Sequence, residues 1–198
     1  MTTWEAWPPA RLVAEIREEL GGAGSDLGLV LGSGLGGVAG RLERRWSRGA
    51  ADLPGYPRST VAGHDGKLLF GRLAGRDLWV VQGRAHLYEG YTPEEATRYL
   101  RLLHALGVRR LVLTNAAGSV DPAAAAPGEV LLCHDALNLF LRPLAPSSWP
   151  GPWRRREPLG DPAFGRLARE VARELGILLR EGILVGSLGP SYETAAEV

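Results

Sequence analysis

The sequence predicts an α/β fold with a mixed, mostly parallel sheet. Short apolar runs, typical of buried strands, alternate along the chain with segments whose apolar residues recur at helical spacing. Strands that alternate with helices are typical of parallel sheets connected by crossover helices. The apolar runs 68–73 and 78–81 are separated by only four residues, 74–77, so we expect one antiparallel hairpin in this sheet.

The same patterns place the individual elements. Gly21 and Gly22 end the first helix, and Thr92 with Pro93 is a typical start for the second. Residues 41–48 contain no convincing apolar run, so no strand is expected there. The expected helices cover 10–20, 92–106, 161–175 and a segment starting at Pro190, and the expected strands cover 27–31, 68–73, 78–81, 109–114, 129–133 and 182–187.

Composition limits the classes of function. The 198 residues suit a single domain over 1–198, and the net charge of +1 gives no electrostatic reason to expect nucleic acid or a membrane surface. Cys133 is the single cysteine, which favours a reducing, cytoplasmic setting. No apolar run approaches the length of a membrane span, and the start of the chain lacks the pattern of a signal peptide.

A polar cluster follows the run 78–81, where a strand is expected to end. The segment 82–91 reads QGRAHLYEGY, and in open α/β sheets ligands bind at the edge where strands end in this way. Arg84 offers a planar set of donors suited to phosphate, and His86 can donate a hydrogen bond or move a proton. The alternative is a solvated turn in which His86 pairs locally with Glu89.

Two further loops follow expected strands. Segment 32–37 reads GSGLGG, and its glycines allow backbone amides to approach an anion, with the Ser33 hydroxyl as a further donor. Segment 115–118 reads NAAG, whose small residues expose backbone amides. The alternative for the first loop is a tight turn between a strand and a helix, and the alternative for the second is close packing of a strand against a turn. The first also matches the dinucleotide-binding pattern G-x-G-x-x-G, but the second strand that this pattern requires is not predicted after it.

Taken together, the motifs resemble the trimeric type of purine nucleoside phosphorylase. They occur in the order of that family: LGSGLG at 31–36, GH at 63–64, QGRAHLYEG at 82–90, TNAAG at 114–118 and GPSYET at 189–194. The resemblance runs from about residue 10 to the last residue. It implies a three-layer α/β/α domain of the phosphorylase/hydrolase-like kind, incomplete at its C-terminus.

The resemblance also assigns roles to residues. It implies phosphate binding by Ser33, His64, Arg84, His86 and the backbone amide of Ala116. It implies ribose and base binding by Tyr88, Ala116, Ala117, Gly118, Tyr192 and Glu193. His86 and Glu193 are the residues it implies for catalysis, Glu193 by holding the N1–H side of a 6-oxopurine.

The implied reaction is reversible phosphorolysis of purine nucleosides to free base and ribose 1-phosphate. Inorganic phosphate is a co-substrate, and we expect no metal and no organic cofactor; the spacing of the four histidines suggests no metal site. The resemblance further implies a role in purine salvage and a homotrimer.

Relatives of this family continue beyond the position that Val198 matches. Their further residues supply a phosphate-binding serine, the asparagine at the purine N7 and O6, and other contacts. Two hypotheses follow: a phosphorylase whose sequence is truncated at the C-terminus, or a non-catalytic remnant that folds and binds phosphate. A dinucleotide-binding protein is the weaker alternative.

Overall fold

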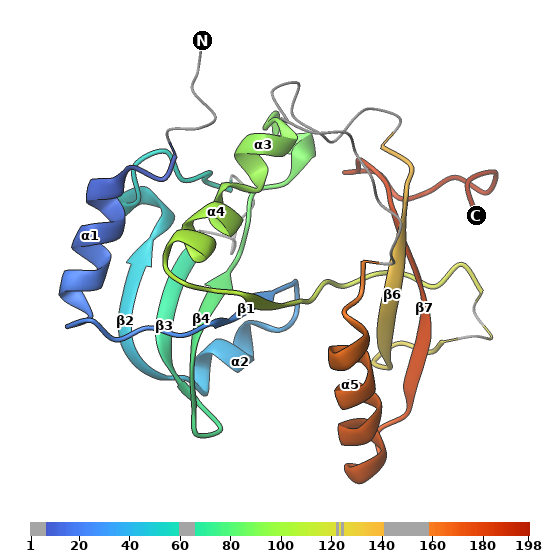
Figure 1. The fold of residues 1–198 in the computed structure, drawn as a ribbon. Coiled ribbons are helices and arrows are strands. Elements are labelled where there is room, and N and C mark those ends of the chain that lie inside the picture. Colours follow the sequence, from blue (N-terminus) through green and yellow to red (C-terminus); the bar gives the residue numbers. More distant parts are fainter. Residues whose placement is uncertain (1–6, 60–65, 122, 124, 141–158) are drawn as a thin grey trace. The chain divides into compact units, whose positions relative to one another are not determined.

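The computed structural model describes residues 7–59, 66–121, 123, 125–140 and 159–198, and they form two compact units (Figure 1). Described residues up to Ala116 belong to the first unit, and those from Ala117 onward belong to the second. The expectation of a single domain over 1–198 stays a prediction. No helix among the described residues is long and apolar enough to cross a membrane.

The first unit is built on a five-stranded mixed sheet in the order β2-β3-β4-β1-β5. The neighbouring strands β4, β1 and β5 are mutually parallel, whereas β3 is antiparallel to both of its neighbours. The expected hairpin is confirmed, because β3 pairs with β4 along its whole length. The strands are β1 (Leu27–Leu31), β2 (Glu43–Gly49), β3 (Lys67–Leu73), β4 (Arg76–Gln82) and β5 (Arg110–Leu113).

Helices cover both faces of this sheet (Figure 1). One face packs against α1 (Ala10–Glu19) and α4 (Arg98–Ala105), through side chains such as Ile16 and Leu102. The other face packs against the short helix α2 (Gly36–Gly40), through Val38 and Ala39. Strand β4 is buried on both faces, so its run of apolar residues has no polar alternation.

The larger core contains an aromatic cluster. Trp79 of β4 lies edge-on to Trp46, with ring centroids 5.7 Å apart, and tilted against Phe70 at 4.9 Å. Edge-to-face arrangements of this kind stabilise a core beyond their area of contact. The Trp46 indole N–H also donates to Glu19 at 2.6 Å, which ties the edge strand β2 to helix α1.

The second unit is smaller. Strands β6 (Val130–Asn138) and β7 (Leu179–Gly186) are parallel, and α5 (Pro162–Glu174) lies between them in the chain. Asp161 caps α5 by accepting from the backbone amides of Ala163 and Phe164. Apart from Ala172, the apolar side chains described in this unit are not fully buried. By itself this unit therefore gains little from the hydrophobic effect.

Three sequence expectations need correction. Residues 43–49 form strand β2, although only Trp46 of its seven residues is buried. The helix expected over 92–106 is divided into α3 (Pro93–Ala96) and α4, with a break at Thr97. No helix starts at Pro190; instead the Thr194 carbonyl accepts from the Val198 amide in a single turn.

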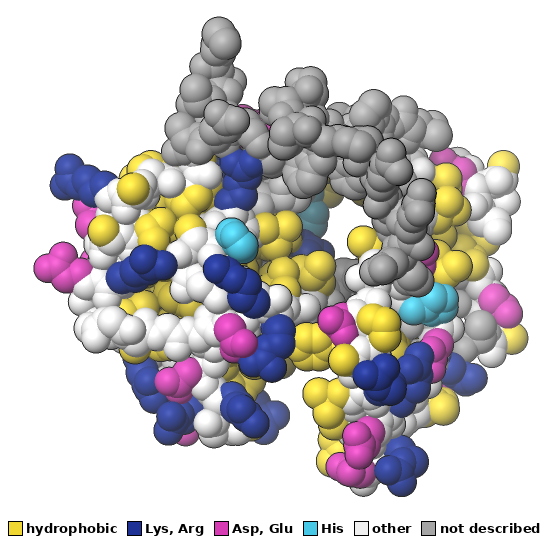
Figure 2. Space-filling view, viewed as in Figure 1, with side chains coloured by type: hydrophobic (Ala, Val, Ile, Leu, Met, Phe, Trp, Pro, Cys, Tyr) yellow, Lys and Arg dark blue, Asp and Glu magenta, His cyan; other side chains and the backbone are white. Residues whose placement is uncertain are grey.

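Charged side chains on the face shown in Figure 2 are of mixed sign, with arginine and acidic residues interspersed. The ion pairs agree with that view, since Arg45 and Arg72 both pair with Asp77 at 3.0 Å. Exposed pairs of this kind contribute little to stability. The fold of the first unit therefore depends on its apolar cores.

We expect Leu102→Ala to lower the free energy of unfolding by about 2–5 kcal/mol, because it opens a cavity in the larger core. Leu102 is 0% exposed. The matched control is Leu113→Ala, which removes the same atoms from a side chain that is 58% exposed and should cost less than about 1 kcal/mol. Urea unfolding followed by tryptophan fluorescence compares the two, and equal losses would contradict this assignment of the core.

Candidate active site

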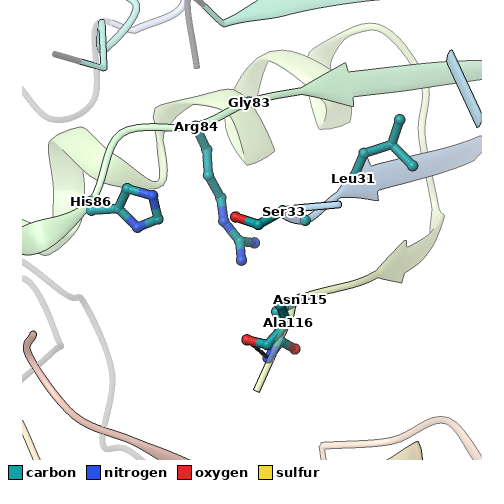
Figure 3. A pocket seen from close by; sticks show the side chains of 8 residues that line it. Leu31, Ser33, Gly83, Arg84, His86, Asn115 and Ala116 are labelled. Carbon is teal, nitrogen blue, oxygen red and sulfur yellow. Dashed lines mark hydrogen bonds between the residues drawn. The ribbon is translucent and has the colours of Figure 1, made fainter. Parts of the chain in front are cut away.

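Three loops of the first unit meet around one pocket (Figure 3). They follow β1, β4 and β5, which are adjacent and parallel, so their carboxyl ends lie at the same edge of the sheet. The pocket has a volume of about 360 Å³, counting the part open to solvent. It is lined by Leu31, Gly32, Ser33, Gly83, Arg84, His86, Asn115 and Ala116.

The loop after β1 brings Ser33 to the pocket. Gly32 lies so close to the loop after β5 that a Cβ atom there would be 2.5 Å from Asn115 Cα. Gly34 has a φ of +84°, a conformation that other residues adopt with strain. The close approach predicted for these glycines is therefore seen at Gly32, which lines the pocket and also contacts the neighbouring loop.

The loop after β4 supplies the positive charge. Figure 3 shows the Arg84 side chain extending from this loop toward Ser33 and Ala116. The guanidinium also contacts the buried Tyr99 hydroxyl: burial raises the pKa of Tyr99, and the charge and hydrogen bond of Arg84 offset part of that rise. Among the described residues no carboxylate forms an ion pair with Arg84.

His86 and Tyr88 lie together in the next part of this loop. Their rings are stacked, with centroids 5.0 Å apart and planes at 8°. Glu89 accepts from the His86 backbone amide at 2.6 Å and from the Ser59 hydroxyl at 3.1 Å. The alternative of a local His86–Glu89 pairing is thus present at least through the backbone of His86, and it holds the short helix η3 (Leu87–Glu89) against the loop.

The loop after β5 places Asn115 and Ala116 at the pocket, across from Arg84 (Figure 3). Ahead of them, the Thr114 hydroxyl accepts from the Gly32 amide at 2.9 Å and donates to the Val30 carbonyl at 2.8 Å. Together the loops can offer a guanidinium, a hydroxyl, an imidazole and backbone amides to one small ligand. Donors of these types, with no carboxylate ion pair described at Arg84, favour an oxyanion.

Tyr88 is not among the residues that line this pocket. His64 lies outside the described residues. Ala117, Gly118, Tyr192 and Glu193 belong to the second unit. Within that unit Tyr192 is 95% exposed, and the Glu193 carboxylate accepts from the Ser187 hydroxyl at 2.6 Å. This hydrogen bond holds the pKa of Glu193 below its usual value.

Residues that support the pocket from behind are not identified by the sequence alone. The helical pattern predicts that Tyr99 is buried but indicates no role at the pocket. The motif at 114–118 includes Thr114 but indicates no function for its side chain. A hydroxyl at the end of an otherwise apolar strand is the available signal for Thr114. Ser59 has no signal, because its contact with Glu89 joins loops that lie 30 residues apart.

The structure does not favour the dinucleotide-binding alternative. That fingerprint needs a strand, a helix and a second strand parallel to the first. Here β2 lies at the far edge of the sheet from β1 and pairs only with β3, in antiparallel orientation, and α2 is five residues long. The described part of the chain also contains no group of three or more side chains that could ligate a metal ion.

Comparison with known proteins gives the family. Residues 26–198 match the model of the Phosphorylase superfamily. Purine nucleoside phosphorylase 1 of Geobacillus stearothermophilus is 39% identical over 176 residues, which cover 87% of this chain and 64% of the relative. The chain therefore spans somewhat less than two thirds of that relative's length.

Solved structures agree. A purine nucleoside phosphorylase in complex with ribose-1-phosphate superimposes with a TM-score of 0.79 at 32% identity, covering 94% of this chain and 71% of the other. The Schistosoma enzyme in complex with hypoxanthine gives 0.78 at 32% identity, covering 94% and 69%. The α/β fold predicted from the sequence is the fold of these proteins. The chain thus belongs to the purine nucleoside phosphorylases of the Phosphorylase superfamily.

Proposed function

We propose that this chain catalyses the reversible phosphorolysis of purine ribonucleosides and 2′-deoxyribonucleosides. The products are the free purine and ribose or deoxyribose 1-phosphate. The observation that carries the proposal is the pocket itself, where Ser33, Arg84, His86 and Ala116 converge from three strand ends. Membership of the family supports the reaction type, and the relative solved with ribose-1-phosphate supports a site for that class of ligand.

Phosphate is the ligand we assign to this pocket. Arg84 would hold two of its oxygens with a planar pair of donors, and the Ser33 hydroxyl, the His86 imidazole and the Ala116 amide would hold the others. His64, which belongs to another of the family's motifs, is proposed as a further phosphate contact. The absence of an ion-paired carboxylate at Arg84 among the described residues supports this assignment, because a bound anion would neutralise its charge.

The nucleoside would lie next to the phosphate. Tyr88 stacks on His86 and keeps 38% of its surface exposed, so its ring can also cover a ribose. We assign the purine to Tyr192, Glu193 and the backbone of 116–118. An ionised Glu193 would accept the N1–H of a 6-oxopurine, and the hydrogen bond from Ser187, which lowers the pKa of Glu193, favours the ionised form. The schistosome relative solved with hypoxanthine supports a 6-oxopurine.

The chemistry follows from charge and position. A phosphate oxygen forms the new bond to C1′ as the bond from C1′ to the purine nitrogen breaks, and the bonding electrons leave with the base, which is then protonated. Positive charge grows on the ribose and negative charge on the purine. A phosphate held beside C1′ stabilises the first, and the oriented donors need no reorganisation during the step. His86 and Glu193 are the residues we assign to catalysis.

The wider setting is proposed on the same grounds. We propose that the protein acts in purine salvage in the cytoplasm, as a homotrimer. It would use phosphate and nucleoside without a metal or organic cofactor, and without nucleic acid or membrane partners. Sedimentation velocity on the purified chain tests the trimer.

Arg84→Ala should lower kcat/KM for phosphate by about 100-fold in an inosine phosphorolysis assay, because it removes the charged donors from the pocket. Hypoxanthine release is followed with and without phosphate. The control is Arg76→Ala, at the opposite end of the same strand and exposed, which should change kcat/KM by less than about twofold. Phosphate-independent release by the native chain, or equal losses in both variants, would contradict the proposed function.

Ser187→Ala should raise the pKa of Glu193, since the Ser187 hydrogen bond is the largest cause that lowers it. The bond stabilises the ionised carboxylate above its ordinary pKa, and this contribution is lost as the pH falls through the lowered value. A ¹³C NMR titration of labelled glutamate measures the change. Ser119→Ala, whose hydroxyl bonds the Asp121 carbonyl instead, should leave the Glu193 titration unchanged. A native titration curve for Ser187→Ala would show that another group lowers the pKa of Glu193.

A further inference from the structure

The Thr114 side chain joins two of the three loops that line the pocket. Its hydroxyl accepts from the Gly32 amide at 2.9 Å and donates to the Val30 carbonyl at 2.8 Å. The Thr114 amide donates to the same carbonyl at 3.0 Å. One side chain thereby satisfies backbone groups on both sides of Leu31, where β1 ends.

These bonds continue the sheet beyond its last paired residues. Regular pairing of β1 with β5 ends at Val30 and Leu113. The Thr114 hydroxyl then takes the place of a backbone partner for Gly32. Ser33 follows Gly32 directly, and Ala116 lies two residues after Thr114. The hydroxyl therefore fixes the spacing between the two loops immediately before the residues that line the pocket.

The loops after β1 and β5 are closely packed against each other at Gly32. A Cβ atom at Gly32 would lie 2.5 Å from Asn115 Cα and 2.7 Å from the Thr114 carbonyl oxygen. The two backbones are thus in contact at Gly32, and the hydrogen bonds of Thr114 hold them there. A shift of either loop would alter the distance between the Ser33 hydroxyl and the Ala116 amide.

We propose that Thr114 is a positioning residue for phosphate: its hydroxyl holds the Ser33 loop and the Ala116 loop at the separation that one phosphate spans. The inference rests on the proposed function, because it assigns phosphate to this pocket. Thr114 itself is not among the residues that line the pocket. Donors held in place before binding lose less conformational entropy when the ligand arrives, which raises affinity.

The test compares a variant that loses the Thr114 hydroxyl with a variant that keeps it. Thr114→Val keeps the branched shape but leaves the Gly32 amide without its acceptor, and Thr114→Ser keeps the hydroxyl. Isothermal titration of inorganic phosphate into the full 198-residue chain should give an affinity about tenfold weaker for Thr114→Val, whereas Thr114→Ser stays within about twofold of the native chain. Each titration is made well below the unfolding midpoint of the variant.

Thr97→Val is the matched control. The Thr97 hydroxyl also donates to a backbone carbonyl, that of Pro93 at 2.7 Å, but on an exposed helix junction whose residues do not line the pocket. It should lose some thermal stability and bind phosphate as the native chain does. Amide hydrogen exchange adds a readout that needs no ligand: exchange at Gly32 should accelerate in Thr114→Val and remain slow in Thr114→Ser.

The outcomes separate the two proposals. Native-chain binding of phosphate with equal affinity in Thr114→Val overturns the positioning role and leaves the proposed function standing. A native chain that binds no phosphate overturns the proposed function, and this inference with it. Weakened binding in Thr114→Val, retained by Thr114→Ser and accompanied by faster Gly32 exchange, supports the role of the hydroxyl.

Discussion

The central position of β1 is the constraint on which the site depends. This strand pairs in parallel with β4 on one side and β5 on the other, and the registers bring Leu31 level with Gln82 and Val30 level with Leu113. Because the three strands end together, their next residues emerge at one edge of the sheet. At Gly28 of β1 a Cβ atom would lie 2.7 Å from a methyl carbon of Leu111, so a larger residue there would force the Leu111 side chain to shift.

Burial of strands β4 and β1 gives two of the three loops a rigid base. Strand β4 contributes side chains to the cores on both faces of the sheet. Trp79 and Val81 lie in one core, and Leu78 and Val80 lie in the other. Side chains in a close-packed core transmit any displacement to their neighbours. Arg84 lies two residues beyond this strand and contacts the buried Tyr99 of α4. A charged group is thus held by the core and extends into the pocket.

Much of the first unit could be predicted from the sequence, because its elements have strong local patterns. Strand β1 and the β3–β4 hairpin are apolar runs bounded by turn residues, and Thr92 with Glu95 forms the capping arrangement expected of a helix start. Strand β2 could not be predicted, since it is an edge strand whose exposed positions are mostly charged. Its single buried side chain, Trp46, is determined by contacts with Trp79 that no local pattern contains.

The residues of the candidate site also differ in whether the sequence alone could identify them. Residues whose own side chains would touch a ligand, such as Arg84 and His86, could be identified because their chemistry is visible in the sequence once a strand end is located. The residues that position these side chains could not be identified, because they act through contacts between segments that lie far apart in the sequence. Thr114 and Gly32 are 82 residues apart, and only the pairing of β1 with β5 brings the hydroxyl of one to the amide of the other. Such a contact has no periodicity, and a hydroxyl at the end of an apolar strand does not indicate which backbone group it will bond. The register of the strands therefore determines where the loops of the candidate site lie, and the donors of those loops determine which ligand fits. Register depends on pairing between segments, so no single residue type reveals it.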